Sequence, residues 1–351
     1  DLHKSRLGAA PVKSVLPEAG VVIRRFSRGR TFLALALFVA VPVLGLWRGP
    51  VTPTAQAAFP GRNGLLVFTV SKIADPTASH GGVDFDLFSV SSSGAALTQI
   101  TSGPEDDYDP AWSPTSDRIA FARSSGLNTQ QDIFVMPAGG GSATNLTATV
   151  LNNDHSPTWS PDGTKIAFVS EHESPAVTYV GLRAAQIFVM DADGGNVRQL
   201  TLAGSHQLSP AWSPDGKMIA YIHLGSNEIR VMRPDGSGSR TVVRPPVPLE
   251  GLSGLSWSPD GRRIAFQTTT DDIWVVASDG SALRNLSAAR KSGLNRDPSW
   301  SPDGQWIAFL GGEPDDMRLY KMRPDGSDVT SIVDIRLTSE TAGKIDWGPR
   351  P

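Results

Sequence analysis

The sequence predicts an all-β protein, a six-bladed β-propeller with four-stranded blades. Three observations support this prediction. The tripeptide Trp-Ser-Pro recurs five times at intervals of 43 to 53 residues, the same short apolar runs follow each copy, and the 351 residues include 35 Gly and 27 Pro. Such a composition favours many turns and short strands over long helices, and a period of about 45 residues is typical of a propeller blade.

Each repeat begins with an inner strand that ends at its Trp. Six of the nine tryptophans occupy this position, and we expect them to form the core between blades: Trp112, Trp159, Trp212, Trp257, Trp300 and, in a degenerate Trp-Gly-Pro, Trp347. A Ser-Pro-Asp-Gly turn follows, in which Pro fixes φ and Gly takes the positive φ that closes a hairpin. This turn stands at residues 160–163, 213–216, 258–261 and 301–304.

Three more strands complete each repeat. The second strand is a short apolar run, found at residues 118–121, 165–168, 218–221, 263–266 and 306–309. The third strand follows a variable loop, at residues 132–136, 186–190, 228–232, 272–276 and 318–322. A second Gly turn then leads to the fourth strand, as at Asp193-Gly194 before residues 197–201.

The first and last repeats predict a closed ring. Residues 59–68 align with residues 112–121, so the first repeat starts at its second strand. The missing inner strand is at the other end of the chain, where residues 344–347 have no blade after them. We expect this segment to pair with residues 65–70, because closure removes exposed sheet edges that would otherwise aggregate.

The first 57 residues differ from the rest and predict a signal peptide. Four arginines between residues 24 and 30 precede the apolar run of residues 31–47, and a polar stretch ending in Ala55-Gln56-Ala57 follows. This is the layout of a secretory signal, and the run is short for a spanning helix, which needs roughly 20 apolar residues. We expect cleavage after Ala57 and a propeller over residues 58–351 located outside the cytoplasm, in the periplasm or cell envelope or secreted. An uncleaved membrane anchor is the alternative.

Composition excludes several functions. The chain has no Cys, which rules out disulfide scaffolds, cysteine-ligated metals and thiol nucleophiles. Residues 1–57 hold eight Lys/Arg against two Asp/Glu, whereas the remaining residues hold 24 against 33. A domain with this excess of acidic residues repels nucleic acid and anionic lipid. We therefore expect no nucleic-acid partner, contact with a membrane only through an uncleaved signal, and a monomer.

The repeats resemble those of the TolB-like β-propeller family, the WD40-like or PD40 repeats. The family pattern is W-S-P-D-G-x-x-I-A-F followed by a D-I-F-V-M strand, and the resemblance covers roughly residues 59–350. It implies a non-enzymatic binding propeller that receives a protein or peptide partner of the cell envelope at the mouth of its channel. TolB carries an α/β domain before the propeller, which 57 residues are too few to form, so we expect a lone propeller.

Departures from the repeat predict where a partner binds. The first strand of each blade lines the channel of a propeller, and the loop before it opens at one mouth. Polar side chains gather three to five residues before the Trp in three blades, and one His lies six residues before its Trp in another. The predicted mouth comprises Asp107, Tyr108, Asp109, Asp154, His155, His206, Arg296 and Asp297. The alternative interpretation is that these polar side chains are only the solvated ends of loops.

Enzyme motifs are incomplete in this chain. His172-Glu173 begins H-E-x-x-H and residues 251–254 come close to G-x-S-x-G, but neither is finished. The Asp-Gly pairs lack the order of a calcium loop. We therefore predict no catalytic residue, metal or cofactor. Two alternatives stay open: a hydrolase or lyase that uses the rim carboxylates with His155 or His206, with or without a divalent ion, and an envelope scaffold that binds carbohydrate.

Overall fold

The computed structural model describes residues 60–73, 83–124, 130–148, 152–173, 183–202, 204–249, 254–290, 293–313, 316–337 and 342–350. The predicted signal peptide and its cleavage site lie outside these residues. Nearly all regular structure in them is β, with one short 3₁₀ helix, η1 (Leu224–Ser226). In the described part of the chain, no helix reaches the length and apolar character that a membrane crossing requires.

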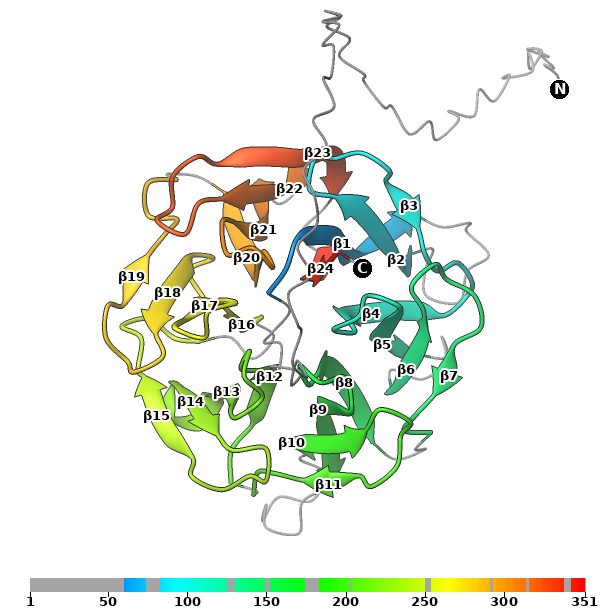
Figure 1. Ribbon diagram of the computed structural model, residues 1–351, viewed down its shortest axis with the longest axis vertical. Coiled ribbons are helices and arrows are strands. Elements are labelled where there is room, and N and C mark those ends of the chain that lie inside the picture. Colours follow the sequence, from blue (N-terminus) through cyan, green and yellow to red (C-terminus); the bar gives the residue numbers. More distant parts are fainter. Residues whose placement is uncertain are drawn as a thin grey trace, which may run out of the picture. The chain divides into compact units, whose positions relative to one another are not determined.

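Six antiparallel sheets of four strands are arranged around a common axis, which confirms the predicted six-bladed propeller (Figure 1). From the axis outward, blade 1 consists of β24 (Ala342–Pro349), β1 (Asn63–Ile73), β2 (Val83–Ser91) and β3 (Thr98–Gln99). Blade 2 consists of β4 (Asp106–Trp112), β5 (Arg118–Ser124), β6 (Gln131–Pro137) and β7 (Thr144–Asn145). Blade 3 consists of β8 (Asn153–Trp159), β9 (Lys165–Glu173), β10 (Arg183–Asp191) and β11 (Arg198–Gln199).

The other three blades repeat this order. Blade 4 consists of β12 (Gln207–Trp212), β13 (Ile219–His223), β14 (Glu228–Met232) and β15 (Arg240–Val243). Blade 5 consists of β16 (Ser256–Trp257), β17 (Arg263–Gln267), β18 (Ile273–Ala277) and β19 (Arg284–Asn285). Blade 6 consists of β20 (Leu294–Trp300), β21 (Ile307–Glu313), β22 (Asp316–Met322) and β23 (Thr330–Leu337).

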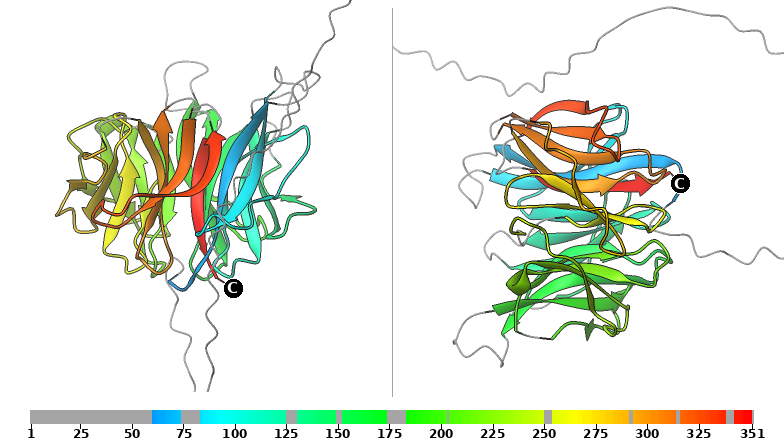
Figure 2. Two further views of the ribbon diagram at one scale, coloured as in Figure 1. Left: turned by 90° about the horizontal axis from the view of Figure 1, so that it is seen from above. Right: turned by 90° about the vertical axis from the view of Figure 1, so that its left-hand side faces the viewer.

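The strands run between two faces of the ring (Figure 2). The connections that precede the inner strands open at one face, here called the mouth face. The Ser-Pro-Asp-Gly turns and the Asp-Gly turns lie at the other ends of the strands, on what we call the turn face. Residues early in an inner strand are therefore near the mouth, and the Trp at its end is near the turn face.

The repeated tryptophans form the core between blades, as predicted. Their exposed fractions lie between 2% and 7%. Trp159 also donates from Nε1 to the backbone oxygen of Ala111 at 3.2 Å, and the backbone nitrogen of Trp112 donates to Asp346 Oδ2 at 2.7 Å. The same position thus buries apolar area and, at these two tryptophans, also joins a blade to its neighbour.

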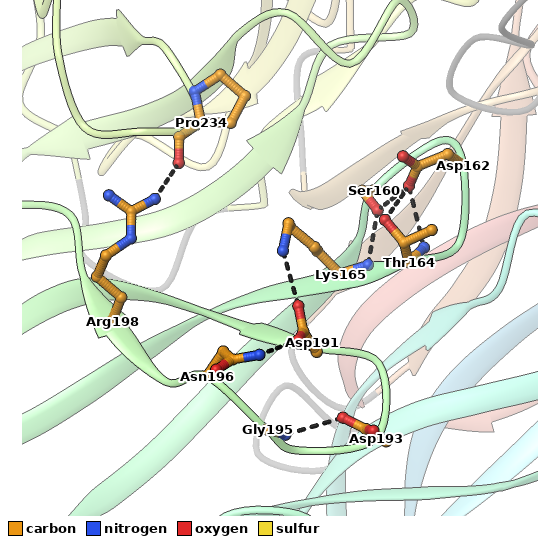
Figure 3. Close-up of polar contacts among 10 residues, drawn as sticks. All are labelled: Ser160, Asp162, Thr164, Lys165, Asp191, Asp193, Gly195, Asn196, Arg198 and Pro234. Carbon is orange, nitrogen blue, oxygen red and sulfur yellow. Dashed lines mark hydrogen bonds and ion pairs between the residues drawn. The ribbon is translucent and has the colours of Figure 1, made fainter.

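Short polar side chains fix the turns that shape each blade. In blade 3, Ser160 Oγ donates to Asp162 Oδ1 at 2.6 Å and accepts from the backbone nitrogen of Lys165 at 2.9 Å (Figure 3). Gly163 in this turn has φ +70°, a conformation that favours glycine. In the second turn Asp193 Oδ1 accepts from the nitrogen of Gly195 at 3.0 Å. The Asp-Gly pairs therefore close the hairpins.

The C-terminal strand closes the ring, also as predicted. Strand β24 pairs antiparallel with β1, with Leu66 opposite Trp347 and Phe68 opposite Ile345. Asn63 reaches blade 6, where its Nδ2 donates to Asp303 Oδ2 at 2.9 Å. Blade 1 is thus built from both ends of the propeller.

Candidate binding site at the channel mouth

A β-bulge interrupts four of the inner strands at the same repeat position. Asp109, Ser156, Ser209 and Asp297, each three residues before the Trp, have φ between 51° and 54°. The strand registers shift at these points. An extra residue on one strand bends it and re-aims the side chain at the bulge. The bulge therefore changes which side chains point away from the blade.

Bonds between blades locate this position at the axis. Asp109 Oδ2 of blade 2 accepts from the nitrogen and Oγ of Ser156 in blade 3, at 3.1 and 2.9 Å. Lys344, three residues before Trp347, belongs to blade 1, yet its Nζ donates to the backbone oxygen of Pro157 in blade 3 at 3.0 Å. A bond from blade 1 to blade 3 bypasses blade 2, so it must pass close to the axis.

Asp297 has the most perturbed carboxyl group at this site. Burial, and next the negative charge of Asp109, raise its pKa to about 7. The charges of Arg296 and Lys344 and a hydrogen bond from the backbone of Gly254 oppose the rise. Asp109 and Asp297 come from blades 2 and 6, so their interaction also bridges the axis.

His155 lies between two carboxylates. Its Nε2 is 3.7 Å from Glu171 Oε1 and its Nδ1 is 4.0 Å from Asp109 Oδ2, while Nδ1 also contacts Ser156 Oγ at 3.0 Å. The polar contact with His155 holds the pKa of Glu171 below its ordinary value. The side chain of Glu171 is 33% exposed, against 7% for His155, so Glu171 is the more accessible member of the pair.

Arg296 is held by a residue that the repeat pattern does not single out. Its Nε donates to Asp271 Oδ1 at 2.6 Å, with side chains 31% and 24% exposed. Asp271 lies in the connection between β17 and β18, and Glu171 lies near the end of β9. Neither residue lies in an inner strand, so the pattern of the inner strands does not predict them. Lys344 could have been found, since it aligns with Asp109 and Asp297.

Two of the predicted aspartates are enclosed within blades. Asp107 is 1% exposed and accepts from Arg123 at 2.6 and 2.9 Å. Burial raises the pKa of Asp107, although Arg123 opposes the rise. Asp154 is 2% exposed. Neither carboxylate is presented to a ligand in this structure.

Tyr108 and His206 also contact residues that lie away from the charged side chains at the axis. The ring of Tyr108 packs against Phe85 with centroids 4.8 Å apart. His206 is exposed, and its Nδ1 accepts from the backbone nitrogen of Ala185 at 3.3 Å. The structure thus brings together Asp109, His155, Arg296 and Asp297 of the predicted set, and adds Glu171, Asp271 and Lys344. We call these seven residues the mouth cluster.

A small cavity lies below the mouth cluster. It has a volume of about 60 Å³ and is lined by residues of all six blades, including Asp297, Lys344 and Asp346. A cavity needs about 10–15 Å³ of such space to hold one water molecule, so this cavity has room for a few waters. Among the described residues, no three His, Asp or Glu side chains are grouped as a metal site. A ligand larger than a few water molecules would therefore have to bind outside this cavity.

Comparisons with known proteins agree with the fold. The family PD40, described as "TolB beta propeller domain", matches residues 87–245 and 183–343. The Tol-Pal system protein TolB of Anaeromyxobacter dehalogenans is 34% identical over 108 residues, which cover 29% of this chain and 24% of that protein. Dipeptidyl-peptidase 5 of Porphyromonas endodontalis is 34% identical over 83 residues, 23% of this chain and 12% of the peptidase.

A solved structure extends the likeness to most of the chain. TolB from Acinetobacter baumannii superposes with a TM-score of 0.62 at 20% identity, over 82% of this chain and 67% of that one. Identity at this level shows the fold alone. The relatives include both a Tol-Pal system protein and a peptidase, of which the chain matches only minor parts. Their names therefore leave both a binding role and a catalytic role open.

Proposed function

Because the chain belongs to the PD40 family of TolB β-propellers, we propose that it is a binding protein outside the cytoplasm that receives a protein or peptide at its channel mouth. One observation carries this proposal. The mouth cluster consists of charged side chains that differ among the blades, whereas the residues that recur in nearly every blade build core and turns. Charged side chains that the recurring core and turn pattern does not require, yet that meet at the axis, suit recognition.

The chemistry of the mouth cluster suits a peptide. Four carboxylates face one Lys, one Arg and one His, so the cluster offers both acceptors and donors. Glu171 and Arg296 are about one-third exposed, which leaves them accessible to a ligand while their partners hold them in place. The likeness to a Tol-Pal system protein supports a protein partner of the cell envelope.

Capture experiments with matched variants test the proposal. The purified chain would be immobilised and exposed to envelope extract as wild type, as the mouth variant Arg296→Ala with Glu171→Gln, and as the control Lys217→Ala. The control removes a charge that is 80% exposed on the turn face. We expect the mouth variant to bind the captured protein at least about tenfold more weakly, which corresponds to about 1.4 kcal/mol, and the control to bind as the wild type does.

Two results would contradict the proposal. Equal capture by the mouth variant and the wild type would mean that the partner does not bind at the mouth. Cleavage of a captured peptide, detected by mass spectrometry and lost in the mouth variant, would favour the hydrolase alternative, which the likeness to a peptidase keeps open.

A further inference from the structure

A second polar hollow lies on the turn face, between blades 5 and 6. It has a volume of about 540 Å³ and is lined by three arginines and the Asp-Gly turn of blade 6. Arg263 and Arg284 come from blade 5 and Arg323 comes from blade 6. This hollow is at the opposite end of the strands from the mouth cluster, so the proposed function does not involve it.

Aromatic rings hold two of these guanidinium groups in place. The Arg263 guanidinium lies over the ring of Trp300 at 4.6 Å, and that of Arg323 lies over Trp306 at 3.9 Å. Stacking on Trp covers a face of a guanidinium and leaves its N–H edge for hydrogen bonds. The two side chains are thus ordered before any ligand arrives, which reduces the entropy cost of binding.

Arg284 departs from its equivalents in blades 3 and 4. Arg198 donates to the backbone oxygens of Pro234 and Asp235 in the next blade, both at 3.0 Å (Figure 3 shows the bond to Pro234). Arg240 likewise donates to the oxygen of Ser278 at 3.2 Å. By contrast, neither Arg284 nor Arg263 donates a side-chain hydrogen bond to any other described residue. Their donors remain available.

The two carboxylates in the hollow already have partners. Asp325 Oδ1 accepts from the nitrogen and Oγ of Ser327 at 3.0 and 2.6 Å, and these bonds, with a smaller contribution from the charge of Arg284, lower its pKa. Asp328 Oδ2 pairs with Arg323 Nε at 3.4 Å. The residues that line the hollow thus include three guanidinium groups and two carboxylates, and Asp260 beside the hollow also feels the charge of Arg263.

The geometry points to a binding site for a phosphate group in this hollow. A carboxylate is satisfied by one bidentate guanidinium, whereas a tetrahedral phosphate has enough oxygens to accept from several guanidinium groups at once. The donors of Arg263 and Arg284 would bind the phosphate oxygens, and Arg323 would add charge from the neighbouring blade. The phosphate could belong to a small soluble compound or to a lipid headgroup.

Calorimetric titration of the purified chain with inorganic phosphate and pyrophosphate, at low ionic strength and pH 7.5, tests this inference. Arg284→Ala is the test variant, because it removes an exposed side chain without hydrogen bonds to the fold. Arg198→Ala is the matched control at the same repeat position. We expect Arg284→Ala to weaken pyrophosphate binding at least about tenfold, and Arg198→Ala to leave it within about twofold.

Further arms identify the ligand chemistry and its source. Acetate should not compete with pyrophosphate at equal concentration. Co-sedimentation with phosphatidylcholine vesicles containing phosphatidic acid, lost in Arg284→Ala, would assign the site to a lipid headgroup, and pyrophosphate binding alone would assign it to a soluble compound. Absence of phosphate binding by the wild type, equal losses in Arg284→Ala and Arg198→Ala, or equal competition by acetate would overturn the inference.

Discussion

Replacing the carboxyl group of Asp297 at the channel axis should change how stability depends on pH. The folded protein raises the pKa of Asp297 from its ordinary 3.8 to about 7. Below pH 4 both the folded and the unfolded chain hold the proton. As the pH rises from about 4 to 7 the unfolded chain releases it first, so stability is lost across this window and the loss is complete above pH 7. Asp297→Asn removes this loss.

The structure sets the size of the effect. At 1.36 kcal/mol per pH unit, the shift from 3.8 to about 7 corresponds to a ceiling of about 4 kcal/mol. Because Asp297 is only partly buried by surface area, solvent reduces this value. We expect Asp297→Asn to raise the free energy of unfolding by about 1–3 kcal/mol at pH 8 relative to pH 4, when each is compared with the wild type.

Urea unfolding of wild type and Asp297→Asn at pH values from 4 to 8 measures this difference. Asp109→Asn is an informative second variant, since loss of the neighbouring negative charge should lower the pKa of Asp297 in the folded protein and so narrow the window from its upper end. Parallel stability profiles for wild type and Asp297→Asn would refute the reasoning, because they would mean that Asp297 titrates alike in the folded and unfolded states.

Three further predictions concern closure, blade contacts and export. Deleting residues 341–351 removes β24 and with it the buried side chains of Ile345 and Trp347, which are at most 3% exposed. Thermal unfolding should then show a free energy of unfolding lower by more than about 5 kcal/mol, or the product should be insoluble. An unchanged melting curve would contradict ring closure. Gly280→Ala should cost at least about 2 kcal/mol in a denaturation experiment, because a Cβ there would lie 2.3 Å from the oxygen of Val242 at φ +92°. Gly261→Ala is its control, because Gly261 has φ +68° but a Cβ there would meet only side-chain atoms at 3.7 Å or more. If both variants lose the same stability, the contact between blades is not the cause. N-terminal sequencing of the exported protein should find Ala58 first, whereas a product that keeps residues 31–47 would indicate an anchor.

The glycine contacts show how far the repeat alone explains the packing between blades. A Cβ at the Gly of each Asp-Gly-type turn would lie 2.0 to 3.0 Å from a backbone oxygen of the preceding blade, and this holds at all six such glycines. The repeated turn therefore specifies a repeated close approach. The repeat also determined the blade number, the strand order and the closing strand, because a residue that recurs at a fixed period meets the same environment in every copy.

The site depended on contacts that no repeat position encodes. Asp107 and Asp109 stand two residues apart, yet Asp107 pairs with Arg123 inside blade 2 while Asp109 meets Ser156 of blade 3. The bulge at Asp109 explains the difference, since an inserted residue breaks the alternation of side chains along a strand. The repeat pattern alone did not reveal this bulge.

The partners of Lys344 and Arg296 could not be predicted because they are distant in the sequence or lie outside the inner strands. Lys344 and Pro157 are 187 residues apart and meet only because the ring closes. Arg296 of blade 6 pairs with Asp271, which lies in the connection between the two middle strands of blade 5. The pKa of Asp297 likewise reflects burial and charges from blades 1 and 2 together. The sequence by itself therefore determined the propeller and the strands that line its axis. Only the tertiary structure decided which charges meet there, because most of those contacts join residues of different blades, and the pair of His155 and Glu171 joins two strands of one blade at positions that the repeat does not mark.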